Sequence, residues 1–208
     1  MKKSLTLGAV VLATVITITA FRTPGDDKAI ESLAIGTVLP KADFKMKDVS
    51  GKEVSFNDVK GKKGLLVIFS CNTCPYVVLY ESRIKEAYLQ AKGSDIGVIL
   101  VNSNEAQRTG VDSYEAMVKH ATDNKYECSY VVDNNSAMAD AFGSSRTPEV
   151  FLFDKDGKLA YKGAIDDSPK DMAAAKDRYL RDALNAVRDG KVVTTSSTKS
   201  IGCSIKRK

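Results

Sequence analysis

The stretch that decides the fold is Leu65 to Val77, which reads LLVIFSCNTCPYV. Its first five residues form an apolar run with β-branched and aromatic members, typical of a strand covered on both faces. The run leads to a C-x-x-C pair, Cys71 and Cys74. A helix starting at about Cys71 places the two sulfurs one turn apart, within reach of a disulfide. Pro75 favours this helix start, because a proline in the first turn gives up an N–H that has no intrahelical partner.

A thiol at a helix N-terminus faces unpaired N–H groups and the positive end of the helix dipole. We therefore expect the pKa of Cys71 to fall and Cys71 to act as the nucleophile. Cys74, deeper in the helix, is placed to attack a mixed disulfide on Cys71 and release the partner. A structural disulfide and half of a zinc site are the alternatives. A C-x-x-C between a buried strand and a helix favours redox chemistry.

The 208 residues suffice for one α/β domain with a substantial core. Residues 1–22 carry two lysines and then an apolar stretch from Leu5 to Phe21, with Ala20 as a candidate cleavage point. This pattern predicts a secretory signal peptide, and an uncleaved membrane anchor is the alternative. We expect an exported protein, periplasmic or secreted, that contacts a membrane only if this segment is uncleaved. Such compartments are oxidising, so a cysteine pair stays disulfide-bonded unless a dedicated reductant reaches it.

The charge pattern argues against a nucleic-acid partner. The formal net charge is +5, and it falls to +3 without Lys2 and Lys3. Lysines and acids are interspersed along the chain, and the basic run at residues 206–208 stands alone.

Outside the motif, periodicity predicts alternating strands and helices. Gly51 separates two short alternating runs, which indicates an N-terminal β-hairpin. The helix after the motif ends at Gly93, and a strand at 96–101 then implies a parallel crossover. Asp112 with Glu115 indicates a capping box that opens a further helix. The remaining expected elements are a polar loop (57–64), a short strand (130–132), a short helix (136–142), a hairpin (150–153 and 159–161) and a final helix (about 170–187).

Pro148 stands just before the first strand of the predicted hairpin. It marks the start of that strand, and we predict a cis Thr147–Pro148 bond there.

The order of these elements resembles the thioredoxin fold, which is α/β with a central mixed β-sheet flanked by helices, here with an N-terminal β-hairpin extension. The long N-terminal lead resembles the redoxin branch, which includes peroxiredoxins of the alkyl hydroperoxide reductase C and thiol-specific antioxidant type. The chain most closely resembles a peroxiredoxin-like subgroup. The segments that carry this resemblance are CNTCPYV (71–77), TPEVFLFD (147–154), IDD (165–167) and SIGCSIK (200–206). The resemblance implies a signal peptide or anchor (1–22), a linker (23–35), a thioredoxin-like domain (36–190) and a C-terminal tail (191–208).

The resemblance also implies roles for individual residues. Cys71 is the attacking thiol and Cys74 the resolving thiol. Pro148 packs as a cis-proline against the disulfide, and the Thr147 backbone pairs with an extended substrate. The chain shows no obvious counterpart of the buried acid that accepts a proton in thioredoxin itself. The implied function is an enzyme, an oxidoreductase that exchanges its disulfide with protein or small thiols, with no cofactor and no metal.

A thiol peroxidase with an antioxidant role is the alternative, with peroxide in place of a redox partner protein. Peroxiredoxins carry the pattern Pro-x-x-x-Thr-x-x-Cys. Aligned on Cys74, Cys71 occupies the threonine position and Val67 the proline position, so the pattern fails. Arg146 either lies near the thiols, where it would lower a pKa or hold peroxide, or is a surface arginine.

Two further cysteines and one histidine leave other interpretations open. Cys128 and Cys203 pair with each other, act as extra resolving thiols, or play no part, and Cys128 fits a small buried residue. Four cysteines and His120 nominally suffice for zinc or copper, although an exposed helical histidine is the usual case. A non-catalytic binding module that keeps a structural disulfide is the third alternative.

Overall fold

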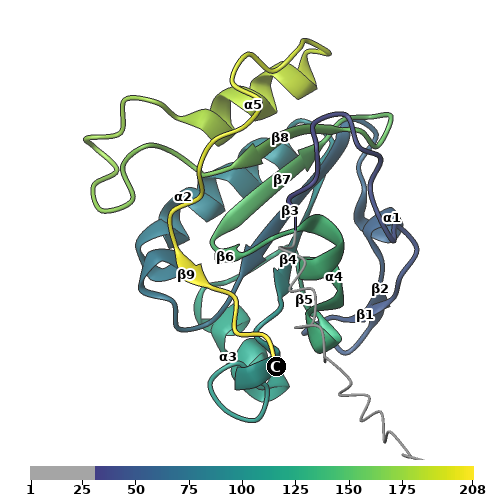
Figure 1. Ribbon diagram of the computed structural model, residues 1–208, viewed down its shortest axis with the longest axis vertical. Coiled ribbons are helices and arrows are strands. Elements are labelled where there is room, and N and C mark those ends of the chain that lie inside the picture. The colour runs from purple at the N-terminus through teal and green to yellow at the C-terminus, as the bar shows by residue number, and fades with distance from the viewer. Residues whose placement is uncertain (1–30) are drawn as a thin grey trace, which may run out of the picture.

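The computed structural model describes residues 31–208, so the predicted signal peptide lies outside the described residues. Its centre is a five-stranded mixed sheet with the strand order β5-β4-β3-β7-β8 (Figure 1). The strands β3 (Gly64–Ser70), β4 (Ile96–Asn102) and β5 (Ser129–Val132) are parallel. The antiparallel hairpin of β7 (Glu149–Phe153) and β8 (Leu159–Gly163) completes the sheet beside β3. The predicted mixed α/β architecture is thereby confirmed.

The other strands lie outside this sheet. β1 (Met46–Lys47) and β2 (Glu53–Val54) form the predicted N-terminal hairpin, and β6 (Arg146–Thr147) pairs with β9 (Cys203–Ser204). The helices are α1 (Phe56–Val59), α2 (Pro75–Lys92), α3 (Tyr114–Asp123), α4 (Ala137–Phe142) and α5 (Tyr179–Arg188), with 3-10 turns at Glu105–Gln107 and Asn134–Ser136.

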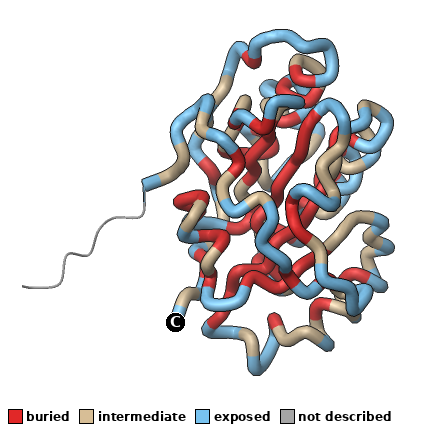
Figure 2. The backbone as a smooth tube through the Cα atoms, turned by 90° about the vertical axis from the view of Figure 1, so that its right-hand side faces the viewer, coloured by how far each residue is buried: buried red, intermediate tan, exposed pale blue. Residues whose placement is uncertain are grey.

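Every residue of β3 is buried, which explains its unbroken apolar run. Figure 2 shows the buried segments, in red, running through the middle of the molecule. Successive side chains of a strand point to opposite faces of the sheet. Leu66 and Ile68 pack in one core with residues of α2 and α5. Val67 and Phe69 pack in a second core with residues of α1 and α4. The sheet is thus covered on both faces, and the C-x-x-C follows its central strand. Within the described part of the chain, no helix combines the length and apolar character needed to cross a membrane.

Three local predictions are wrong. The 57–64 segment is not wholly a loop, because Ser55 and Asp58 form a capping box that starts α1. The cap of α3 is Ser113, whose side chain accepts from the Ala116 N–H, and Asp112 has a different role.

The last helix is shorter than the predicted 170–187, since α5 begins at Tyr179. The preceding residues form a loop in which the Asp167 carboxylate accepts the N–H groups of Lys176 and Asp177. Met172, which fitted the helical period, instead lines a pocket between this loop and α2. An Asp side chain that binds nearby backbone N–H groups competes in this way with helix formation.

Candidate thiol site

The two cysteines lie at the junction of β3 and α2, but the helix does not begin at Cys71 as predicted. Pro75 is its first residue, and Cys74 is the N-cap with extended φ and ψ of −65° and 123°. The proline ring disfavours helical geometry in the residue before it, so Cys74 cannot be part of the helix. Cys71 to Thr73 therefore form a turn in front of the helix.

Both thiols are shielded, with 2% of Cys71 and 4% of Cys74 exposed. The Thr147–Pro148 peptide bond is cis, as predicted, and brings Thr147 against both sulfurs. The Cys71 Sγ lies 3.4 Å from the Thr147 hydroxyl oxygen, and the Cys74 Sγ lies 3.1 Å from the Thr147 carbonyl oxygen. The structure thus brings together all four residues of the predicted site, although Thr147 and Pro148 follow the cysteines by more than seventy positions.

The prediction that the pKa of Cys71 falls is wrong. A hydrogen bond from Cys71 to the Cys74 sulfur raises the pKa of Cys71 and lowers that of Cys74, to about 4. The Val77 N–H in the first turn of α2 and the thiol and N–H of Cys203 also favour the Cys74 thiolate. The contact with the Thr147 carbonyl is a hydrogen bond only while Cys74 is protonated, so it opposes ionisation. Together these influences favour the negative charge on Cys74 over one on Cys71.

Asp112 adds to this asymmetry. Its negative charge is a further cause of the raised pKa of Cys71. In the reduced pair these influences favour a proton on Cys71 and a thiolate on Cys74.

Asp112 is the acidic residue that sequence reasoning missed. It is fully buried, and its Oδ1 accepts the Asn72 N–H at 2.9 Å and the Asn102 amide at 2.8 Å. Its Oδ2 accepts the Asn104 amide at 2.9 Å. The network also includes the Tyr130 hydroxyl, which donates to the Asn72 side-chain oxygen at 2.8 Å. Asp112 thereby fixes the turn between the two cysteines.

One signal pointed towards this network. Asn102 to Asn104 are the polar exit of β4, and parallel strands bring their carboxyl-terminal loops to the same edge of a sheet. This rule alone could have placed the polar groups after β3 and β4 near one another. The identity of Asp112 as their acceptor required the path of the intervening loop.

The C-terminal tail reaches the same site. β9 pairs with β6 in the register Thr147↔Cys203. This pairing brings the thiol and N–H of Cys203 close enough to lower the pKa of Cys74. The final segment, yellow in Figure 1, passes the start of α2 on its way to the C-terminus. The backbone edge of Thr147, which the resemblance assigns to an extended substrate, is occupied here by the protein's own tail.

The remaining candidates lie elsewhere. Arg146 is a surface arginine, and its guanidinium donates to the Gly202 carbonyl at 3.0 Å. Half-buried Cys128 lines a surface pocket with Ile84 of α2. The His120 Nε2 lies 3.2 Å from the Glu81 Oε1. Across residues 31–208, no three His, Cys, Asp or Glu side chains are arranged to hold a metal ion.

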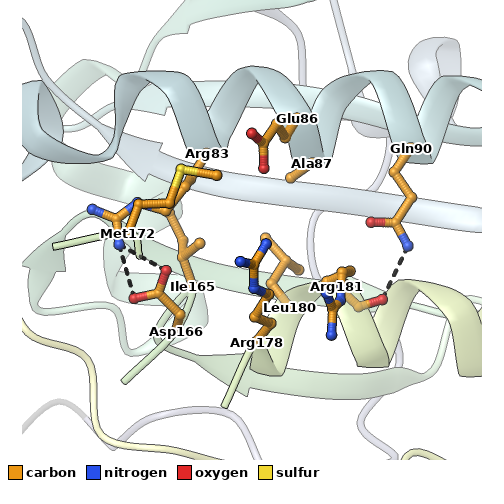
Figure 3. Close-up of a pocket in the computed structure, with 10 residues that line it drawn as sticks. All are labelled: Arg83, Glu86, Ala87, Gln90, Ile165, Asp166, Met172, Arg178, Leu180 and Arg181. Atoms are coloured by element: carbon orange, nitrogen blue, oxygen red, sulfur yellow. Dashed lines mark hydrogen bonds and ion pairs between the residues drawn. The ribbon is translucent and has the colours of Figure 1, made fainter. Parts of the chain in front are cut away.

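A separate pocket opens between α2 and α5 (Figure 3). Arg83 projects from α2 beside it and binds the Asp166 carboxylate at 2.7 Å, with both side chains more than nine-tenths buried. Arg83 also donates to the Ser168 and Pro169 carbonyls. No cysteine lines this pocket, and Arg83 joins α2 to the segment that follows β8.

Comparison with known proteins places this geometry among redox proteins. A family profile described as Redoxin matches residues 34–179, which include both cysteines of the motif. The thiol-disulfide oxidoreductase ResA of Bacillus thuringiensis (strain Al Hakam) is 26% identical over 133 residues, covering 62% of this chain and 69% of that protein.

Solved structures agree on the fold. A hypothetical protein from Sinorhizobium meliloti 1021 is 32% identical with a TM-score of 0.78, over 86% of this chain and 97% of that chain. Peroxidoxin BcpB from Mycobacterium tuberculosis is 14% identical with a TM-score of 0.58, over 76% of this chain and 97% of that chain. The second similarity shows the fold alone.

Proposed function

This chain belongs to the redoxin family of thioredoxin-like oxidoreductases, and on that premise we propose that it exchanges disulfides through Cys71 and Cys74. The observation that supports this most directly is the position of Cys74 as N-cap of α2, with the Cys71 thiol as a hydrogen-bond donor beside it. Thr147 and Pro148 complete the proposed catalytic site. The proposed catalytic unit is residues 36–190 with the tail at 191–208.

The proposed reaction has two steps. The Cys74 thiolate attacks one sulfur of a substrate disulfide, and the substrate S–S bond breaks and releases one thiolate. Cys71 then attacks the Cys74 sulfur, forms the Cys71–Cys74 disulfide and releases the second substrate thiol. The thiol pair gives up two electrons and two protons, and both substrate sulfurs are reduced. The opposite direction oxidises a substrate dithiol by the same steps.

The local electrostatics suit this order. While Cys74 is ionised, Cys71 holds its proton, because the neighbouring sulfur accepts it in a hydrogen bond. Once Cys74 is part of a mixed disulfide, its negative charge is gone and the main cause of the raised pKa of Cys71 disappears. The resolving thiol is thus activated when it is needed.

Disulfide exchange fits the site better than peroxide reduction does. The threonine position of the peroxiredoxin pattern is Cys71, and the Arg146 guanidinium binds the Gly202 carbonyl at the surface. Among the described residues near Cys74, neither feature that holds a peroxide in peroxiredoxins is therefore in place. We expect the reduced protein to react with hydrogen peroxide no faster than an ordinary free thiol, as measured by stopped-flow mixing and mass spectrometry of the cysteines.

The partner that we propose is a redox partner protein or a low-molecular-weight thiol. The proposed location is an exported compartment. That part of the proposal rests on the N-terminal pattern of the sequence.

Trapping experiments test the proposed function. Cys71→Ser/Cys203→Ser should accumulate a mixed disulfide on Cys74, because serine at position 71 keeps a hydroxyl donor and neither serine can resolve the adduct. Cys74→Ser should abolish exchange and form no adduct at Cys71. Cys128→Ser is the matched control and should exchange at the parental rate. The opposite pattern, with stable adducts on Cys71 in Cys74→Ser, would restore Cys71 as the nucleophile.

A further inference from the structure

We propose that Cys203 is a second resolving thiol for Cys74, so that the tail strand β9 contributes a residue to the redox reaction. The inference rests on the proposed function of Cys74. It assigns chemistry to a residue that is 129 positions away from Cys74 in the sequence.

Backbone pairing places Cys203 at the reacting sulfur. Cys203 is the partner of Thr147 in the β6–β9 ladder, and the Thr147 carbonyl oxygen lies 3.1 Å from the Cys74 Sγ. The thiol and N–H of Cys203 are close enough to the Cys74 sulfur to lower the pKa of Cys74. The Tyr76 N–H at the start of α2 is likewise close enough to the Cys203 sulfur to influence its pKa. Two sulfurs therefore share the same helix N-terminus.

The tail is held on both sides of Cys203. Before it, the Ser200 hydroxyl donates to the Glu149 Oε1 at 3.0 Å. After it, the Ile205 N–H donates to the Ser145 carbonyl at 3.0 Å, and the Ile205 side chain is buried. Arg207 then forms an ion pair with Asp140 at 2.8 Å. These contacts hold the Cys203 thiol at the site, so that it does not swing out into solvent.

Gly202 lets the tail approach this closely. A Cβ at position 202 would lie 2.2 Å from the Thr147 carbonyl oxygen, a distance that no side chain tolerates. Glycine is therefore required for β9 to lie against the cis-proline loop. Gly202 thus permits the close approach of the tail, and Cys203 follows directly beside Cys74.

The proposed reaction of Cys203 is a thiol–disulfide exchange with the mixed disulfide on Cys74. After Cys74 has attacked a substrate disulfide, Cys203 attacks the Cys74 sulfur, releases the bound substrate thiol and forms a Cys74–Cys203 disulfide. The proton of Cys203 goes to the leaving thiolate, and the substrate disulfide is the oxidant. Cys71 can then attack Cys74 and regenerate Cys203, which moves the disulfide into the motif without further oxidation. The tail thus occupies the backbone edge of Thr147 that was predicted to bind substrate. There the Cys203 thiol reacts with Cys74 as a substrate thiol would.

The experiment compares two reduced variants, Cys71→Ser/Cys128→Ser and Cys71→Ser/Cys128→Ser/Cys203→Ser. Each receives one equivalent of 5,5′-dithiobis(2-nitrobenzoate), and mass spectrometry follows the adduct on Cys74. With Cys203 present, we expect loss of the adduct, release of both halves of the reagent and a Cys74–Cys203 disulfide. Without Cys203, the adduct should persist at least about tenfold longer, because no intramolecular thiol replaces it.

A third variant guards against a folding artefact. Gly202→Ala in the Cys71→Ser/Cys128→Ser background keeps Cys203 but moves the tail away, so resolution should slow while circular dichroism stays unchanged. Equal adduct lifetimes with and without Cys203 would overturn the inference and leave the proposed function standing. Failure of Cys74 to form an adduct in any variant would refute both.

Discussion

The Cys71 thiol beside Cys74 is the strongest influence on which thiol of the pair ionises. The pKa of Cys74 is lowered to about 4, first by the Cys71 thiol that donates to its sulfur. A thiol with a lowered pKa is already ionised at neutral pH, so alkylation of Cys74 by iodoacetamide should be independent of pH above roughly pH 6. The rate should fall only on acidification towards the pKa.

Two substitutions at position 71 separate the hydrogen bond from the sulfur. Cys71→Ala removes the donor, and the alkylation profile of Cys74 should move up towards the ordinary thiol pKa of about 8.5. Cys71→Ser keeps a donor and should leave the profile nearly in place. If both variants shift equally, the hydrogen bond is not the cause of the low pKa.

Asp112 is expected to matter for stability because three donors depend on it. Asp112→Ala leaves the Asn72 N–H and the amides of Asn102 and Asn104 without their acceptor in a buried site. The free energy of unfolding should fall by about 2–3 kcal/mol in urea denaturation. Asp123→Ala is the control, since its carboxylate binds Lys119 at the surface, and it should cost less than about 0.5 kcal/mol. Equal losses in the two variants would contradict the role of Asp112.

At the scale of elements, α2 is fixed to the end of β8 by a buried ion pair. Arg83 contacts Asp166 at 2.7 Å, and Asp166 also accepts from the Tyr80 hydroxyl at 3.0 Å. Asp166→Ala should lower the free energy of unfolding by about 3–5 kcal/mol, because it leaves a buried charge without its partner.

Two comparisons make this prediction specific. Asp182→Ala removes a partner of Arg181 at the surface and should change stability by less than about 0.5 kcal/mol. The double variant Arg83→Met/Asp166→Leu removes both charges and should recover most of the loss. A single variant as stable as the double variant would show that the pair does not hold α2 in place.

At the scale of the whole molecule, the tail closes the redox site. Ile205 is 6% exposed and Ile201 is 41% exposed, so the two isoleucines on either side of Cys203 form a natural contrast. Ile205→Asp should detach β9, and amide exchange at residues 203–206 should accelerate. The rate of Cys74 alkylation by a bulky maleimide should rise roughly tenfold. This factor corresponds to a loss of about 1.4 kcal/mol from the free energy that holds the tail closed over Cys74.

Ile201→Asp controls for the added charge and should leave both rates near their parental values. A maleimide rate that does not respond to Ile205→Asp would show that β9 does not restrict access to Cys74.

Periodicity and spacing along the chain were enough to predict the buried strand β3, the hairpin of β7 and β8, and the cis bond before Pro148. Spacing was also enough to select Cys71 and Cys74 as candidate site residues, and the resemblance to thioredoxin-like proteins added Thr147 and Pro148. These features depend on neighbours in the sequence or on a fold whose order of elements is recognisable. The first helical residue was missed because the restriction that Pro75 places on Cys74 outweighed the general preference for a helix start at the motif.

The sequence by itself determined the kind of chemistry, because a C-x-x-C after a buried strand is a local pattern. Only the tertiary structure brought Asp112 and Cys203, which reach the site through long loops, to the two sulfurs whose pKa values they influence. The tail shows the same division: its composition carries no periodicity, and its pairing with Thr147 follows from contacts across more than fifty residues. Electrostatic balance at a buried thiol is set by every group within a few ångströms, and chain order does not reveal which groups those are.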